Sequence, residues 1–484
     1  MLWRGERLTY GEGNALVRTV ATQLRRIDEE NGGDGRVAVY SANCPAAIIV
    51  WLAAQAAGLT PVTLNRHHRG NVLRNVVERA GASVLVTDSA GADELGSLGL
   101  TKTHRPVVLS RELCGLGVLL DGGTAPPAEA VRPAPQDPAT IMFSSGTTGS
   151  SKGVIIPHGM FDAGSRRLAE AWNVTSEDVF HCWVPWYHIA AQQDVFALAL
   201  RAGAGIALFE GISISKFWEQ IRESEATIFG GFVTVLEMLH AQPAQVDERN
   251  HRLRFGIAGH IPAKLQGLFE ARFGVPMLDA YGMSEAEPLT IPSLTPRPPR
   301  GSVGKANPDF EIAVQRDDGG RCVAGEEGQI VFRPLSEHVM MREYLDDPQR
   351  TAASWKNGWF RTGDLGAMDA GGNLFYRDRI GELIRVGGEN VSPQELESVL
   401  MAHPCIAEAA VLGVAAPLGE HQVVALVVAN APLDELTVQQ WCAERAAKFM
   451  VPSSVLFVDR IPRTPTSKVQ RTSLQALLKD LAQN

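Results

Sequence analysis

A run of hydroxyl and glycine residues at positions 144–153 has the composition of an anion-binding loop. It reads Ser-Ser-Gly-Thr-Thr-Gly-Ser-Ser-Lys-Gly and directly follows the apolar segment 141–143. Glycine tolerates the positive φ values that turn successive backbone N–H groups inward around an anion. The hydroxyl groups add donors, and Lys152 adds a positive charge suited to a polyphosphate. A flexible polar surface loop is the alternative for this run. The P-loop pattern G-x-x-x-x-G-K-[ST] does not fit, so P-loop NTPase chemistry is not predicted.

A second motif, Asp-Ala-Tyr-Gly-Met-Ser-Glu at 279–285, combines an aromatic ring, a glycine, a hydroxyl and a carboxylate. Such a group can serve a nucleotide, because Tyr281 can stack on a base while Gly282 admits the ligand closely. Ser284 can bind phosphate, and Glu285 can hold Mg²⁺ through oxygen. Taken alone, the motif is better explained as a turn at a strand end with a solvated glutamate. Only its combination with the loop at 144–153 favours a nucleotide site.

The two motifs together resemble the signature sequences of the adenylate-forming superfamily, which includes acyl-CoA synthetases, adenylation domains and luciferases. Further motifs in the same order extend the resemblance over nearly the whole chain. Serine stands at 151 and at 467, where this family usually has proline and glycine respectively. The runs at 270–275, 387–392 and 447–452 most resemble the carnitine/crotonobetaine-type acyl-CoA ligases.

The resemblance implies a role for each matching residue. Asp364, in Arg-Thr-Gly-Asp, would accept hydrogen bonds from both ribose hydroxyls, with a turn-capping carboxylate as the alternative. Arg379 would lie beside the ribose and phosphate, and Tyr376 would contact the base. Glu285 and Thr148 would hold Mg²⁺. The complete set implied for the nucleotide and its transfer is Ser144, Ser145, Gly146, Thr147, Thr148, Gly149, Lys152, Ala258, Gly259, Tyr281, Gly282, Ser284, Asp364, Tyr376, Arg379, Gly387 and Gly388.

The resemblance also implies catalysis in two half-reactions, with Lys468, Glu285, Thr148 and Arg379 as the catalytic residues. A carboxylate anion must approach the α-phosphate, and the Lys468 ammonium would offset the repulsion between the two negative groups. The Gly387-Gly388 loop would replace Lys468 for the second half-reaction. An exposed lysine near a chain end and a Gly-Gly turn before a helix are the alternatives.

Aromatic residues and a histidine at 183–188 resemble the segment that lines the acyl pocket of the family. A lone histidine is more often packed than catalytic, so no acid–base role is predicted for it. The substrate-lining set implied by the resemblance is His188, Phe232, His260, Gly282 and Met283.

Strands that alternate with helices must position these motifs, which predicts βαβ units and parallel sheet. The predicted strands are 37–40, 61–64, 84–87, 254–258, 275–279, 328–333, 409–414 and 423–428. The predicted helices are 45–57, 71–80, 262–273, 394–402 and 437–448. The stretch 120–138, rich in proline, alanine and glycine, predicts a loose linker.

A break near 378–382 predicts two domains. The fold class is α/β, with a large N-terminal domain (1–380) of parallel and mixed sheets with flanking helices and a small, mobile α+β C-terminal domain (381–484). Gly381 is expected at the hinge, because glycine absorbs changes of φ and ψ easily.

Composition restricts the partners that we expect. The 484 residues are 45% apolar and 20% charged, which is typical of a globular protein of two or more domains. A net charge of −9 without a basic cluster argues against nucleic-acid and membrane partners. Six cysteines without a C-x-x-C pair predict a reduced, cytoplasmic protein without a zinc site. The N-terminus lacks the apolar core of a signal peptide. The sequence does not determine the oligomeric state, and a homodimer is one of the alternatives.

The function predicted from these residues is ATP- and Mg²⁺-dependent activation of a small carboxylic acid by adenylation, followed by transfer to coenzyme A. Two alternatives keep the first step, with a carrier-protein thiol or an amine as acceptor, or with nitrite as the activated group for diazotisation of an aryl amine. A third alternative is a non-catalytic nucleotide binder. The presence of Lys468, Glu285 and Asp364 argues against it.

Overall fold

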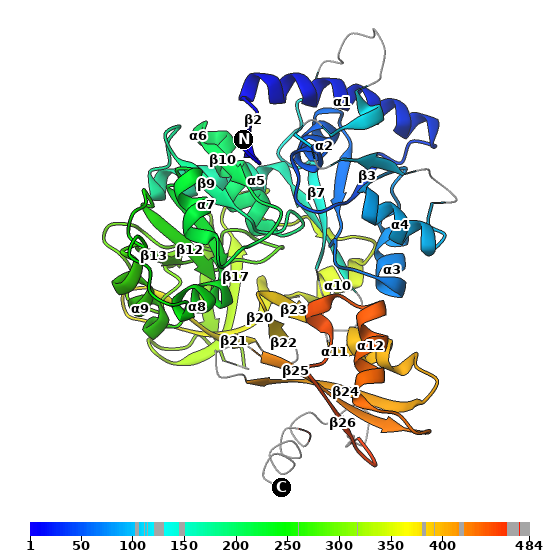
Figure 1. Ribbon diagram of the computed structural model, residues 1–484. Coiled ribbons are helices and arrows are strands. Elements are labelled where there is room, and N and C mark those ends of the chain that lie inside the picture. The colour runs from blue at the N-terminus through cyan, green and yellow to red at the C-terminus, as the bar shows by residue number, and fades with distance from the viewer. Residues whose placement is uncertain are drawn as a thin grey trace. The chain divides into compact units, whose positions relative to one another are not determined.

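The computed structural model describes residues 1–101, 106–110, 112–113, 115–120, 130–144, 151–259, 261–316, 318–379, 384–391, 393–415, 421–461 and 474. The chain divides into two compact units (Figure 1). The first comprises Met1–Arg66, Val76–Ser144 and Lys152–Ile380, and the second His67–Asn75, Ser145–Ser151 and Gly381–Asn484.

One seven-stranded mixed sheet of the first unit has the strand order β18-β8-β7-β4-β3-β5-β6. Strands β3 to β7 pair parallel with one another, as expected for strands joined by helices. Strand β8 returns antiparallel beside β7, and β18 adds antiparallel to β8. The bounds are β3 Arg36–Tyr40, β4 Thr60–Thr63, β5 Val84–Asp88, β6 Val107–Leu109, β7 Pro138–Ser144, β8 Lys152–Pro157 and β18 Glu343–Tyr344.

A second seven-stranded sheet has the order β13-β12-β11-β9-β10-β1-β2. All neighbours in it are parallel except β1 and β2. The carboxyl ends of β9, β11, β12 and β13 therefore meet at one edge, where ligands of open parallel sheets usually bind. The bounds are β1 Leu2–Trp3, β2 Glu6–Arg7, β9 Val179–Cys182, β10 Gly205–Leu208, β11 Ile228–Phe232, β12 Phe255–Gly259 and β13 Met277–Asp279.

A third sheet of the first unit is antiparallel and carries the predicted ribose-binding residues. Its order is β16-β17-β20-β19, and β21 also pairs with β20. Two short strands, β14 and β15, pair separately. The bounds are β14 Thr290–Ile291, β15 Lys305–Ala306, β16 Phe310–Gln315, β17 Glu327–Pro334, β19 Trp355–Lys356, β20 Trp359–Met368 and β21 Leu374–Arg379.

The helices up to residue 380 begin and end where local chemistry allows. Thr9 and Glu12 form a capping box at the start of α1. Pro45 stands at the first position of α2, whose apolar residues are mostly buried. The bounds are α1 Tyr10–Glu30, α2 Pro45–Ala56, α3 Gly70–Ala80, α4 Ser89–Ser97, η1 Gly117–Leu119, α5 His158–Trp172, the π-helix η2 Ala191–Ala197, α6 Leu198–Ala202, α7 Phe217–Glu223, α8 Val233–Ala241, α9 Ala263–Phe273 and α10 Pro348–Ala353.

The second unit is a small α+β arrangement with its own hydrophobic core. Leu396, Val411 and Val438, each from a different element, are all buried in this core. A three-stranded sheet has the order β24-β25-β26, and β22 and β23 form a separate hairpin. The bounds are β22 Ile384–Val386, β23 Glu389–Val391, α11 Pro393–Met401, β24 Ile406–Ala415, β25 His421–Ala429, α12 Glu435–Arg445, η3 Lys448–Met450 and β26 Ser454–Phe457.

The structure confirms the predicted α/β fold class, and each predicted strand and helix corresponds to an observed element. The main differences are at element ends. The helix predicted over 437–448 ends at Arg445, because Ala446 has extended backbone. The strand predicted from 275 begins at Met277. Of the linker predicted over 120–138, the described residues 120 and 130–137 contain neither helix nor strand, and Pro138 begins β7. The domain boundary at 380 and the hinge at Gly381 stay predictions.

Candidate active site

The β7–β8 hairpin positions Lys152. In its antiparallel register Ser144 lies opposite Lys152, and Phe143 lies opposite Gly153. The connection between the two strands is therefore the run of glycines and hydroxyls in which we predicted phosphate binding. The lysine stands at the first residue of β8, on the strand rather than in the loop.

Lys152 forms a buried polar cluster with Glu285 and Tyr344. Its Nζ donates to Glu285 Oε1 at 2.5 Å and to the Tyr344 hydroxyl at 3.1 Å. The Tyr344 hydroxyl in turn donates to Glu285 Oε1 at 2.7 Å. The structure thus brings together two residues predicted for the site and adds a third that sequence reasoning missed. Tyr344 lies on a two-residue strand paired with β8, which is too short to recognise from periodicity.

The cluster keeps the Glu285 carboxylate ionised. Burial alone would raise its pKa, but the Lys152 ammonium and the two donated hydrogen bonds outweigh burial, so the pKa of Glu285 lies below its usual range. Burial and the Glu285 charge raise the pKa of Tyr344, which therefore remains a protonated donor. The result is a carboxylate that is 2% exposed and still negatively charged.

A tight turn presents the Glu285 side chain. Met283 and Ala286 exchange two backbone hydrogen bonds, of 3.0 and 2.8 Å, which places Ser284 and Glu285 at the tip. The backbone N–H of Met341 donates to the Glu285 carbonyl at 2.7 Å and ties the segment before β18 to this turn. The motif at 279–285 is therefore held by contacts on both sides.

The residues predicted for the ribose and base also meet. The Tyr281 hydroxyl donates to Asp364 Oδ2 at 2.6 Å, and both side chains are buried. The ring centroids of Tyr281 and Tyr376 are 6.0 Å apart. Asp364 lies in β20 opposite Arg379 of β21, although the side chain of Arg379 is outside the described atoms. The structure thus brings together three residues predicted for the nucleotide: Tyr281, Asp364 and Tyr376.

The predicted acyl-binding residues gather at the carboxyl ends of the parallel strands. Phe232 ends β11 and lies opposite Gly259, while Ala258 lies opposite Asp279 of β13. The His188 ring is 5.8 Å from the Phe232 ring, centroid to centroid. His188 and Phe232, both predicted to line the substrate site, thus lie close together, and Ala258 and Gly259, predicted for the nucleotide, end the neighbouring strand. The roles of these residues in binding stay predictions.

Gly282 leaves room for a residue that was not predicted, Glu287. A Cβ on Gly282 would overlap the Glu287 carboxylate. The Glu287 carboxylate thus occupies the space beside the Gly282 backbone. In the sequence, Glu287 is distinguished only as the single charged residue of the segment 286–291.

Gly387 and Gly388 form the turn of the β22–β23 hairpin in the second unit. Their φ values are 60° and 79°, a region that residues with a Cβ rarely adopt. The structure thus explains both glycines by the turn, and a transfer role stays a prediction.

Several predicted site residues lie outside the described part of the chain. They are Ser145, Gly146, Thr147, Thr148, Gly149, His260 and Lys468. The side chain of Ser144 is likewise not described.

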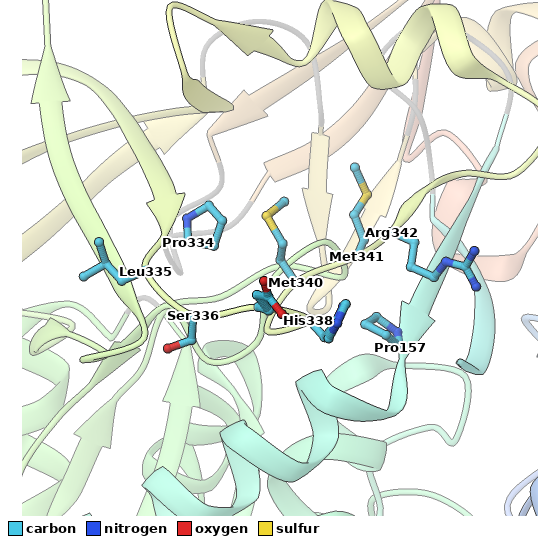
Figure 2. A pocket seen from close by; sticks show the side chains of 9 residues that line it. Pro157, Pro334, Leu335, Ser336, His338, Met340, Met341 and Arg342 are labelled. Atoms are coloured by element: carbon cyan, nitrogen blue, oxygen red, sulfur yellow. Dashed lines mark ion pairs between the residues drawn. The ribbon is translucent and has the colours of Figure 1, made fainter. Parts of the chain in front are cut away.

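A pocket of about 520 Å³ opens at the segment that precedes β18 (Figure 2). Both apolar and polar residues line the pocket. One of them, Met341, donates its backbone N–H to the carbonyl of Glu285. None of the residues predicted for the site lines this pocket. The lining residues are Pro157, Pro334, Leu335, Ser336, Glu337, His338, Met340, Met341 and Arg342.

Within the described ranges, no three histidine, cysteine or carboxylate side chains are grouped as a metal site would need. No described helix is both long enough and apolar enough to cross a membrane.

Comparison with known proteins agrees with this geometry. Residues 1–345 match the family model of the AMP-binding enzymes, and residues 395–468 match that of the AMP-binding enzyme C-terminal domain. A crotonobetaine/carnitine–CoA ligase of Salmonella paratyphi A is 30% identical, over 96% of this chain and 93% of the relative.

Two solved structures are similar over almost the whole chain. An o-succinylbenzoate CoA synthetase from Bacillus subtilis superposes with a TM-score of 0.85 at 27% identity, covering 98% of this chain and 95% of that one. An amide bond synthetase from Marinactinospora thermotolerans superposes with a TM-score of 0.83 at 26% identity, covering 98% of this chain and 96% of that one. The resemblance inferred from the motifs is confirmed: the chain belongs to the family of AMP-binding, adenylate-forming enzymes.

Proposed function

We propose that this protein activates a small carboxylic acid with ATP, forming an acyl adenylate and pyrophosphate, and then transfers the acyl group to coenzyme A. The observation that carries the proposal is the buried Lys152–Glu285–Tyr344 cluster in the same unit as the Tyr281–Asp364 pair. One cluster supplies charge for a polyphosphate, and the other supplies a carboxylate for a ribose.

Adenylation needs both the Lys152–Glu285–Tyr344 cluster and the Tyr281–Asp364 pair. A carboxylate is a poor electrophile, whereas the mixed anhydride with AMP has a good leaving group. Lys152 begins β8 beside the glycine-rich connection, where its ammonium can bind the β- and γ-phosphates that leave as pyrophosphate. The Asp364 carboxylate accepts from Tyr281 through Oδ2, and a carboxylate is a suitable acceptor for the hydroxyls of a ribose.

Glu285 fits a role in holding Mg²⁺. The ion prefers carboxylate and phosphate oxygens and keeps several waters, so one protein carboxylate is enough. Oε1 of Glu285 accepts from Lys152 and Tyr344, and both donors orient the carboxyl group. Mg²⁺ bound there would neutralise charge on the departing phosphates.

Coenzyme A is the acceptor that the relatives favour. The Salmonella relative and the Bacillus structure are named for CoA thioester formation. The amide bond synthetase keeps an amine acceptor as the second candidate. A carrier-protein thiol and nitrite activation have no comparable support among these relatives. For catalysis in two conformations, we propose Lys468 in the first step and the Gly387-Gly388 turn in the second.

The test separates the two half-reactions. Lys468→Ala should lower adenylate formation by about 100- to 1,000-fold, because an ammonium that stabilises transition-state charge is lost. Thioester formation from pre-made acyl adenylate and coenzyme A should continue. Lys216→Ala, at an exposed lysine of the first unit, is the matched control and should alter neither step. Equal loss of both steps in Lys468→Ala would exclude the two-conformation mechanism, and pyrophosphate release that no acid stimulates would exclude acid activation.

A further inference from the structure

Asn43 is a buried amide that bonds four backbone groups beside the second seven-stranded sheet. It lies between β3 and α2 and is 6% exposed. Its Nδ2 donates to the carbonyl oxygens of Val184, Phe209 and Trp183 at 3.0, 3.2 and 3.3 Å. Its Oδ1 accepts from the backbone N–H of Trp186 at 2.8 Å. These partners follow β9 and β10, so Asn43 joins the two seven-stranded sheets at the carboxyl ends of their strands.

An amide is the side chain that this position requires. Around it stand three carbonyl acceptors and one N–H donor, and an amide offers both N–H groups and a carbonyl oxygen. A carboxylate would turn an acceptor toward the three carbonyls, and an apolar side chain would leave buried backbone groups without partners. Because all four partners are backbone groups, Asn43 determines the course of the main chain there.

Trp186 is held through both of its backbone groups and through its ring. Its N–H is bound by Asn43, and its carbonyl oxygen accepts from Gln192 Nε2 at 3.1 Å. Its ring meets those of Trp51 and Phe196 edge to face, at centroid distances of 5.1 and 4.5 Å. Trp186 is 3% exposed and forms a fixed point between β9 and η2.

Residues predicted to line the substrate site follow directly from this fixed point. The N–H of His188 donates to the Pro185 carbonyl at 2.9 Å and closes a turn. The rings of His188 and Trp183 both meet that of Phe232, at centroid distances of 5.8 and 5.4 Å. His188 and Phe232 are partly exposed, whereas Asn43 is buried. The position of the accessible rings therefore depends on a buried amide.

We propose that Asn43 is a positioning residue for the acid substrate, because it holds the segment 183–188 that carries the Trp183 and His188 rings. The inference rests on the proposed function and adds a residue that acts through the backbone. The carboxylate reaches the α-phosphate only within a narrow range of geometry, so a small displacement of these rings lowers catalytic efficiency. Lys152 and Asp364, which we assign to ATP, lie on other strands, β8 and β20. Binding of ATP should therefore not depend on Asn43.

The test compares Asn43→Ala with a matched control, Thr227→Val. Thr227 is a second buried polar residue of the same sheet, just before β11 at the amino edge, where its hydroxyl donates to Asp178 and accepts from the Val179 N–H. Pyrophosphate release with acetate, hexanoate, 3-methylbutanoate and benzoate identifies the best acid for wild type. With that acid, Asn43→Ala should lower kcat/KM by about 10- to 100-fold while KM for ATP stays unchanged. Thr227→Val should keep both values.

Hydrogen exchange supplies a readout that needs no activity. Backbone amides of 183–188 should exchange faster in Asn43→Ala than in wild type, because the acceptor of the Trp186 N–H is lost. Thr227→Val should leave the exchange of this segment unchanged. Equal exchange in wild type and Asn43→Ala, or an equal rise of KM for acid and ATP in that variant, overturns this inference and leaves the proposed function standing.

Two further outcomes are decided in the same experiment. If no acid drives pyrophosphate release in wild type, the proposed function fails, and the exchange result alone decides whether Asn43 holds the segment. If Asn43→Ala does not fold, Gln192→Met replaces it, since this change removes the donor to the Trp186 carbonyl and keeps the length of the side chain. A lower kcat/KM for the acid with unchanged KM for ATP then supports the inference, and wild-type values of both overturn it.

Discussion

Two glutamates that stand two residues apart in the chain show opposite behaviour in the same fold. Glu285 and Glu287 are both more than nine-tenths buried. Glu285 accepts from an ammonium and a phenol, and its pKa lies below the usual range. Glu287 accepts from neither of these groups, and burial together with the charge of Asp194 raises its pKa.

The difference teaches that burial alone does not decide the charge of a carboxyl group. Removing a carboxylate from water always disfavours ionisation, so its protonation state depends on what replaces the water. Lys152 supplies that replacement for Glu285. No hydrogen bond or ion pair from the described residues supplies such a replacement for Glu287, so burial raises the pKa of its carboxyl group.

The largest effect is expected from Glu285→Gln. The change keeps the size of the side chain but removes the charge that would hold Mg²⁺, so adenylation should fall by about 100-fold or more. The Mg²⁺ concentration for half-maximal rate should rise. The matched variant is Glu287→Gln, with the same chemical change two residues later, and its Mg²⁺ dependence should equal that of wild type. If wild type, Glu285→Gln and Glu287→Gln all showed the same Mg²⁺ dependence, Glu285 would not be a ligand of the metal ion.

A pH-dependent difference in stability should follow from Glu287. The pKa of Glu287 in the folded state is raised well above 4.5, so above about pH 4.5 the folded state keeps a proton that the unfolded state loses. Stability should therefore fall as pH rises above this value, by up to about 1.4 kcal/mol per pH unit for one proton. Denaturant unfolding of wild type and Glu287→Gln from pH 4 to 8 measures the difference.

In Glu287→Gln that decline should be reduced. Glu326→Gln is the control, because its ion pair with Arg316 lowers the pKa of Glu326 and its contribution is lost only toward acid pH. Parallel stability curves for wild type and Glu287→Gln above pH 5 would show that Glu287 holds no extra proton.

The smallest effect is expected from Tyr344→Phe, which removes one hydrogen bond to Glu285 and keeps the ring. A loss of about 1 kcal/mol corresponds to a roughly five-fold higher KM for Mg·ATP, with a modest decrease in melting temperature. The control is Tyr10→Phe, which also removes a tyrosine hydroxyl. That hydroxyl donates to the backbone carbonyls of Ala199 and Ala204. This variant should lower the melting temperature without changing that KM. A KM change of the same size in both variants would make the Tyr344 effect structural.

Much of the scaffold could be predicted from local pattern. Alternating strands and helices over 37–87 follow from apolar runs separated by turn residues, and these runs are buried in the observed parallel sheet. The short strand β18 could not be predicted, because two residues carry no periodicity. Asp194 was detectable only as the single charge in the apolar segment 189–200, which by itself does not indicate a partner.

The amino-acid order alone identified the family, because the phosphate-loop and Tyr-Gly-Met-Ser-Glu motifs are local and their chemistry depends on adjacent residues. Only the tertiary structure decided which partner each carboxylate has. Tyr344 reaches Lys152 across 192 positions because β18 pairs with β8. The Glu287 carboxylate lies over Gly282, where the charge of Asp194, 93 positions earlier in the chain, raises its pKa. Charge states in a folded protein depend on such distant neighbours, and no local pattern contains them.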